Sequence, residues 1–87
     1  MLFLNIYYPK EGKREEINKQ LEEKGLGVPE GTKMIGHWLR LDGGGGFAIF
    51  ETDKPDYEWT MMWNDLCDME FIPILDYEKD VMSLFKE

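Results

Sequence analysis

The sequence predicts an α+β domain in which four strands and two helices follow one another in the order β-α-β-β-α-β, with one more helix at the end. Alternation of apolar residues marks the strands, and apolar residues three or four positions apart mark the helices. A run of four glycines joins the second and third strands. At 87 residues the chain forms one domain (1–87), whose small core would gain from a second subunit.

The first strand is expected over residues 1–8, where apolar side chains fall on both faces. A strand that is apolar on both faces belongs to a sheet that is covered on both sides. Asn5 is the polar exception, and it either contacts a ligand or bonds to the backbone or to water. The first helix is expected over residues 13–24, ending at Gly25, with a thin apolar stripe that covers one face of the sheet.

The two central strands, within residues 32–53, form a hairpin that carries the only histidine of the chain. His37 and Trp38 lie on opposite sides of the first arm, and Glu51 ends the second arm. If the register places them on one face, His37 and Glu51 would act as a catalytic acid/base pair. A structural role is the alternative for a lone histidine on a strand. The glycine run suits a tight turn and lacks the ending of a phosphate-binding loop.

The second helix is expected to begin at residues 53–55 and to run to Leu66. Trp59 and Trp63 fall one turn apart on the same face of this helix. Either this face packs into the core, or its two indoles line a pocket for a flat organic ligand.

Acidic residues follow at the carboxyl end of the second helix, where the helix macrodipole favours cations. Asp65 and Asp68 stand there, and Glu70 comes directly after. We expect basic side chains or backbone donors from elsewhere to compensate them, with a weak divalent-cation site as the alternative. Cys67 lies between the two aspartates, and negative neighbours disfavour its thiolate, so it is a poor nucleophile.

The fourth strand is expected over residues 70–75, and Pro73 places it at the edge of the sheet or at a bulge. Asp76 then begins a short helix whose apolar stripe either closes over its own sheet or reaches a partner. This element order is the ferredoxin-like plan, in which helices cover one sheet face. A second copy is the simplest cover for the other face, so we predict a homodimer whose two sheets enclose a barrel-like interior.

The net charge of −8 comes from the second half of the chain, because acids and bases balance up to Phe50. Such a negative field disfavours binding to nucleic acid or to an anionic membrane surface. The sequence shows no apolar run long enough for a membrane span and no signal-peptide pattern at its start. A single cysteine suits a reducing compartment. We therefore expect a cytoplasmic protein.

The segment from residue 29 to residue 73 resembles the uncharacterised domain-of-unknown-function family 3303. The residues that carry the resemblance are Pro29-Glu30-Gly31, Trp38, Phe47, Glu51 and the run WTMMWNDLCDMEFIP at residues 59–73. The sequence departs from the family pattern in Gly36-His37 before Trp38 and in its four-glycine turn. The family is similar to dimeric α/β-barrel proteins, so the resemblance implies that fold, and it implies no established reaction.

The wider dimeric-barrel group contains cofactor-free monooxygenases, haem-degrading enzymes and isomerases. Asn5 and Trp59 stand at places similar to those of the Asn and Trp that flank the ligand in the haem-degrading members. The helical histidine that binds haem iron there has no counterpart in residues 63–69. The resemblance therefore favours chemistry without a cofactor, in which polar groups position an activated aromatic substrate.

Three functions follow from this sequence, and no cofactor or metal is expected for any of them. The first is a dimer that binds a small planar organic ligand in its barrel cavity, with or without catalysis. The second is a cofactor-independent monooxygenase or isomerase that acts on an aromatic substrate through His37 and Glu51. The third is an interaction module with a packed interior. The residues expected to line the cavity of the first two are Asn5, His37, Trp38, Glu51, Trp59 and Trp63.

Overall fold

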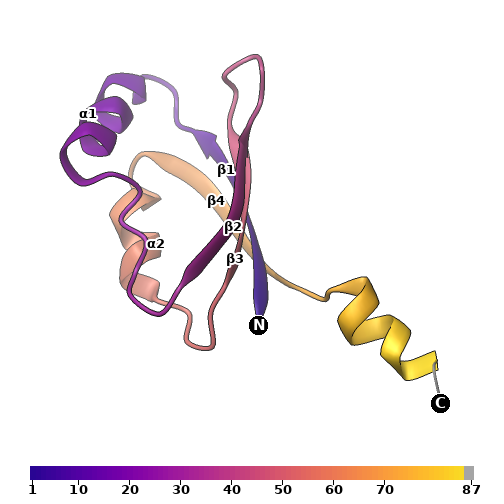
Figure 1. The fold of residues 1–87 in the computed structure, drawn as a ribbon. Helices are drawn as coiled ribbons and strands as arrows, with labels where there is room; N and C mark the ends of the chain where they lie inside the picture. The colour runs from indigo at the N-terminus through magenta and orange to yellow at the C-terminus, as the bar shows by residue number, and fades with distance from the viewer. Residues whose placement is uncertain (86–87) are drawn as a thin grey trace.

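A computed structural model, which describes residues 1–85, shows a four-stranded antiparallel sheet with two α-helices on one side (Figure 1). The strands are β1 (Leu2–Pro9), β2 (Lys33–Leu39), β3 (Gly46–Glu51) and β4 (Cys67–Ile74), and the helices are α1 (Arg14–Lys24) and α2 (Tyr57–Asn64). The strand order across the sheet is β2-β3-β1-β4. The predicted α+β class is confirmed, and this order is compatible with the ferredoxin-like plan.

The junction between α2 and β4 differs from the prediction. Asp56 caps α2 by accepting a hydrogen bond from the Glu58 backbone N–H at 2.9 Å, so the helix begins later than expected. The helix ends at Asn64, and β4 begins at Cys67 because its pairing with β1 extends to Pro9. Asp68 therefore lies in a strand, and the predicted conflict with the helix dipole is wrong for it.

The core lies between the sheet and α2 and is centred on Phe50, which is only 3% exposed. The ring of Phe50 stacks on that of Phe3 with centroids 5.6 Å apart. It meets the rings of Trp59 and Phe71 edge-on, at 5.1 Å and 6.1 Å. Such pairs add roughly 0.5–1.5 kcal/mol each beyond the area they bury. This cluster joins α2 to β1, β3 and β4.

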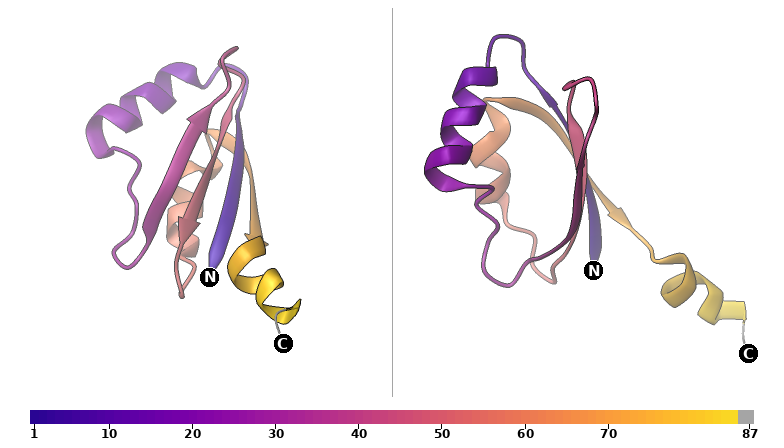
Figure 2. Two further views of the ribbon diagram at one scale, coloured as in Figure 1. Left: turned by 45° about the vertical axis from the view of Figure 1, so that its right-hand side comes forward. Right: turned by 45° about the horizontal axis from the view of Figure 1, so that its top comes forward.

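The opposite face of the sheet carries no helix, as the right-hand view in Figure 2 shows, and the strand registers place both apolar residues and the acidic Glu51, Asp68 and Glu70 on it. The strand registers bring six apolar side chains together on it, and we call them the open face: Leu4, Ile6, Trp38, Phe47, Ile49 and Ile72. Trp38 stacks on Phe47 with ring centroids 5.2 Å apart, and the two remain 48% and 43% exposed. Helices cover one face of β1, as the sequence predicts, whereas the other face is uncovered in the single chain, so its second covering layer stays a prediction.

The C-terminal helical segment stands away from the sheet (Figures 1 and 2). It consists of a π-helical turn, η1 (Tyr77–Val81), and a 3-10 turn, η2 (Met82–Phe85). Asp76 caps it, accepting a hydrogen bond from the Lys79 backbone N–H at 3.0 Å, as the sequence predicts. Its apolar residues Tyr77, Leu84 and Phe85 are largely exposed, so it does not close over its own sheet. Within residues 1–85, no helix has both the length and the apolar character needed to cross a bilayer.

The glycine run allows the β2–β3 turn to approach β1 closely. Gly45 has a φ of +140°, and a Cβ there would overlap the backbone oxygen of Tyr7. A Cβ at Gly46 would lie 2.7 Å from the phenolic oxygen of Tyr7. Gly45 is therefore required for both conformation and space, and Gly46 for space alone.

We predict that Gly45→Ala destabilises the protein by about 2 kcal/mol or more, because it combines a strained φ with a backbone overlap. Gly44→Ala is the control, since the nearest atoms there belong to the flexible ends of Asp42 and Arg40. Urea unfolding of the three proteins checks this. Equal midpoints for Gly45→Ala and Gly44→Ala would contradict the account of the turn.

Candidate functional site

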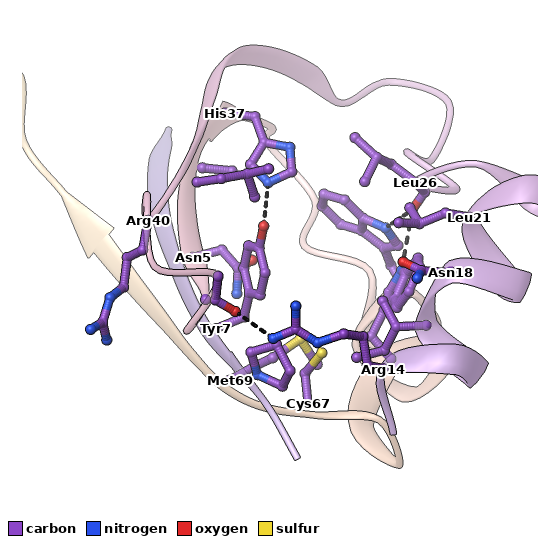
Figure 3. A pocket seen from close by; sticks show the side chains of 18 of the residues that line it. Asn5, Tyr7, Arg14, Asn18, Leu21, Leu26, His37, Arg40, Cys67 and Met69 are labelled. Carbon is purple, nitrogen blue, oxygen red and sulfur yellow. Dashed lines mark hydrogen bonds between the residues drawn. The ribbon is translucent and has the colours of Figure 1, made fainter. Parts of the chain in front are cut away.

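A cavity of about 330 Å³ lies between the sheet and the two α-helices (Figure 3). Its walls are mostly apolar and aromatic, with a few polar side chains among them. The lining residues from the strands include Asn5, Tyr7, Met34, His37, Ala48, Met69 and Phe71, and those from the helices include Arg14, Ile17, Leu21, Trp59 and Trp63. A concave apolar site with a few convergent polar groups is the usual form of a small-molecule site.

The cavity exists because α1 does not pack closely on the sheet. The helix has no buried residue, and its two apolar side chains, Ile17 and Leu21, line the cavity. Polar contacts hold it instead. Gln20 donates to the carbonyl oxygen of Met62 in α2 at 2.9 Å, and Arg14 donates to the carbonyl oxygen of Gly43 in the hairpin turn at 3.1 Å.

Tyr7 and His37 form the central polar pair of the cavity. The phenolic oxygen of Tyr7 lies 2.7 Å from Nε2 of His37, and the two rings meet edge-on (Figure 3). Gly46 leaves the space that the phenol occupies. Asn5 stands two residues before Tyr7 on the same strand face, and its side-chain amide donates to the carbonyl oxygen of Glu70 at 3.2 Å.

Both members of this pair are neutral near pH 7. Partial burial lowers the pKa of His37, although the residue as a whole remains exposed. Burial raises the pKa of Tyr7, and the nearby Cys67 raises it further. A neutral imidazole has one donor and one acceptor nitrogen, so Nε2 either accepts from the phenol or donates to it, according to the tautomer.

Four of the predicted site residues share this cavity: Asn5, His37, Trp59 and Trp63. The indole N–H groups of Trp59 and Trp63 both donate to the carbonyl oxygen of Leu26, at 2.9 Å and 3.2 Å. These bonds hold the two rings against the loop that follows α1. Both alternatives for this face of α2 therefore apply to Trp59, which contacts Phe50 in the core and also lines the cavity.

The structure does not bring Glu51 and His37 together, so the conditional acid/base pair does not form. A bulge shifts the β2–β3 register between Met34 and Gly36, and His37 then pairs with Ala48 while Glu51 pairs with Lys33. Glu51 lies outside the cavity.

Trp38 also lies outside the cavity, on the open face. Its indole covers Gly36, where a Cβ would overlap the ring. Trp38 and His37 therefore belong to different surfaces. The cavity itself differs from the expected one, because it is formed by one chain between its sheet and helices and not between two sheets.

Tyr7 and Arg14 line the cavity but were not among the predicted site residues. A signal existed for Tyr7, because it follows Asn5 at the spacing that puts both side chains on one strand face. None existed for Arg14, whose position depends on a contact with a turn 29 residues away.

The acidic residues near β4 do not form a metal site in the described part of the chain. Asp65 caps the carboxyl end of α2, and Asp68 and Glu70 lie in β4. No group of three or more His, Cys, Asp or Glu side chains in residues 1–85 could hold a metal ion. Cys67 is buried, and burial together with Asp68 raises the pKa of its thiol, which disfavours the reactive thiolate.

The whole chain, residues 1–87, matches the family model described as Domain of unknown function (DUF3303), and the chain belongs to this family. The family resemblance that the sequence analysis found over residues 29–73 is confirmed. No curated protein and no solved structure matches the chain. The family description assigns no activity, so the function has to be argued from the cavity.

We predict that the pKa of His37 lies below that of histidine in an unstructured peptide, because the cavity partly desolvates the imidazolium. Since His37 is the only histidine, its ring resonances in an NMR pH titration are unambiguous. In the pH window between the folded-state pKa and the ordinary pKa of histidine, the unfolded chain binds more protons at His37 than the folded protein does. Lowering the pH through this window therefore lowers the free energy of unfolding. His37→Gln should lose less stability over the same window. A normal or raised pKa would contradict this.

Proposed function

We propose that this member of the DUF3303 family binds a small planar organic molecule in the cavity between its sheet and its helices, and does so as a homodimer. One observation supports the binding role above all. The cavity is walled by aromatic and aliphatic side chains, and its polar groups converge in the Tyr7–His37 pair with Asn5 beside it. Apolar walls supply affinity, and a few fixed polar groups supply orientation.

A flat ligand fits this arrangement of walls. Phe71 lies on the sheet side and Trp59 and Trp63 on the helix side. Aromatic rings favour offset or edge-on contacts with another ring. A planar molecule between these walls would place one edge at the Tyr7–His37 pair, where the neutral phenol and imidazole offer a donor and an acceptor.

The proposed dimer follows from the open face. A second copy would cover this apolar surface, and two sheets facing each other would form the dimeric α/β barrel. The exposed apolar residues of η1 and η2 do not cover their own sheet, and in the dimer they would contact the partner subunit. The ligand cavity lies on the other side of the sheet, so a packed barrel interior and a ligand site are compatible.

We predict that Phe47→Glu converts the dimer to a monomer, because it would place a carboxylate in the apolar interface. Phe47 is 43% exposed in the single chain, so the folded subunit should tolerate the change. Met61→Glu, at an exposed position on α2, is the control and should stay dimeric. Light scattering coupled to gel filtration gives the masses. A monomeric wild-type protein would overturn the dimer.

We predict that the protein binds 2-naphthamide, an uncharged planar bicycle, and that Leu21→Trp abolishes the binding by filling the cavity. Leu21 projects from α1, which does not pack closely on the sheet, so the larger ring should be accommodated. Leu41→Trp, at a fully exposed position in the turn, is the control. Isothermal titration calorimetry measures the affinity. Equal binding to both variants would place the ligand elsewhere.

A second candidate function is proton-transfer catalysis, as in a cofactor-independent monooxygenase or an isomerase with an aromatic substrate. The observation that favours it is the neutral His37 held 2.7 Å from the Tyr7 phenol in a largely apolar cavity. A base with a lowered pKa is unprotonated at neutral pH, and an adjacent phenol can stabilise the enolate or phenolate that proton removal leaves.

We predict that the protein accelerates exchange of the acidic C–H protons of 2-tetralone with D₂O, followed by NMR, by roughly a hundredfold. His37→Gln should return the rate to that of buffer while retaining the binding of 2-naphthamide. Tyr7→Phe should give an intermediate rate. If the wild-type protein does not raise the exchange rate above that of buffer, the catalytic proposal is wrong and the binding proposal is unaffected.

A further inference from the structure

We infer that the ligand of this cavity is an anion, namely a planar aromatic molecule with a carboxylate that pairs with Arg14. This inference rests on the proposed binding role and adds the charge of the ligand. It comes from the distribution of charge around the cavity, which is opposite to that of the chain as a whole.

The chain has 18 acidic and 10 basic residues, and its surface is therefore negative overall. Among the residues of 1–85 that line the cavity, none is Asp or Glu, whereas Arg14 and Arg40 both contribute. Because no carboxylate lines the cavity, an anion bound there would have no negative side chain beside it, although the protein as a whole is acidic. Two guanidinium groups, by contrast, lie among the residues that line the cavity.

The two arginines are not equivalent. Arg40 pairs with Asp42, and the Gly44 backbone N–H and Arg40 lower the pKa of that carboxyl, which keeps it charged. The charge of Arg40 is thus compensated, and its side chain points away from the other labelled residues in Figure 3. Arg14 instead has only a neutral acceptor, the carbonyl oxygen of Gly43, and forms no ion pair within residues 1–85.

The position of Arg14 is fixed from two sides. It is the first residue of α1, and its guanidinium rests against Gly43, where a Cβ would come within 3.3 Å of it. Figure 3 shows this guanidinium among the lining residues, on the side of Tyr7 and Met69. One bond to Gly43 leaves the other N–H donors of the guanidinium for a planar, bidentate acceptor, the geometry that a carboxylate offers.

The experiment compares two ligands of the same shape, 2-naphthoate and 2-naphthamide, by isothermal titration calorimetry at low salt. The wild-type protein should bind the naphthoate roughly tenfold more tightly, as expected for a charge-assisted hydrogen bond at an exposed site. Arg14→Gln should lose this preference while still binding the amide. Lys19→Gln, which removes a charge from α1 outside the cavity, is the matched control and should keep the preference.

The other outcomes separate the two proposals. Equal affinity of the wild-type protein for both compounds would overturn the charge assignment and leave the binding role intact. If Arg14→Gln binds neither compound, the role of Arg14 is to hold α1 against the turn, and this result would also overturn the charge assignment. If the wild-type protein binds neither compound, the cavity is not a site for planar bicyclic ligands, and the proposed function fails together with the inference.

Discussion

The packing of Phe50 against rings from two other strands and from α2 determines where the rest of the structure can be. It is the most deeply buried aromatic residue among those described, and its neighbours Phe3, Phe71 and Trp59 fix one end of the space between sheet and helices. Beyond this cluster α1 supplies only Ile17 and Leu21, which is too little apolar surface to fill the gap. The cavity is therefore a direct consequence of a core that is concentrated at α2.

Local sequence patterns predicted the elements well, because alternation and helical spacing are properties of short segments. They predicted the edge position of Pro73 and the cap at Asp76, both of which the structure shows. They did not predict the boundary between α2 and β4, since the helical apolar pattern continues through Leu66 while pairing with β1 already draws Cys67 into a strand. Long-range pairing decided that boundary, and no local pattern records it.

The site was predictable in part for the same reason. Asn5, His37, Trp59 and Trp63 were singled out by residue type and do share the cavity. Their expected companions Trp38 and Glu51 do not, because which residues of β3 face His37 depends on a bulge at the start of β2. A single extra residue in one strand changes every pairing beyond it. The contacts of Tyr7 and Arg14 likewise depend on the folded position of a distant turn.

We propose separate roles for the two sides of the sheet, with subunit pairing on the open face and ligand binding on the helix side. Native mass spectrometry of protein purified gently from its expression host tests this most directly. We expect a dimer that carries the extra mass of an acidic aromatic compound. A protein that stays bare and monomeric, even after incubation with a small-molecule extract of the host, would contradict this proposal.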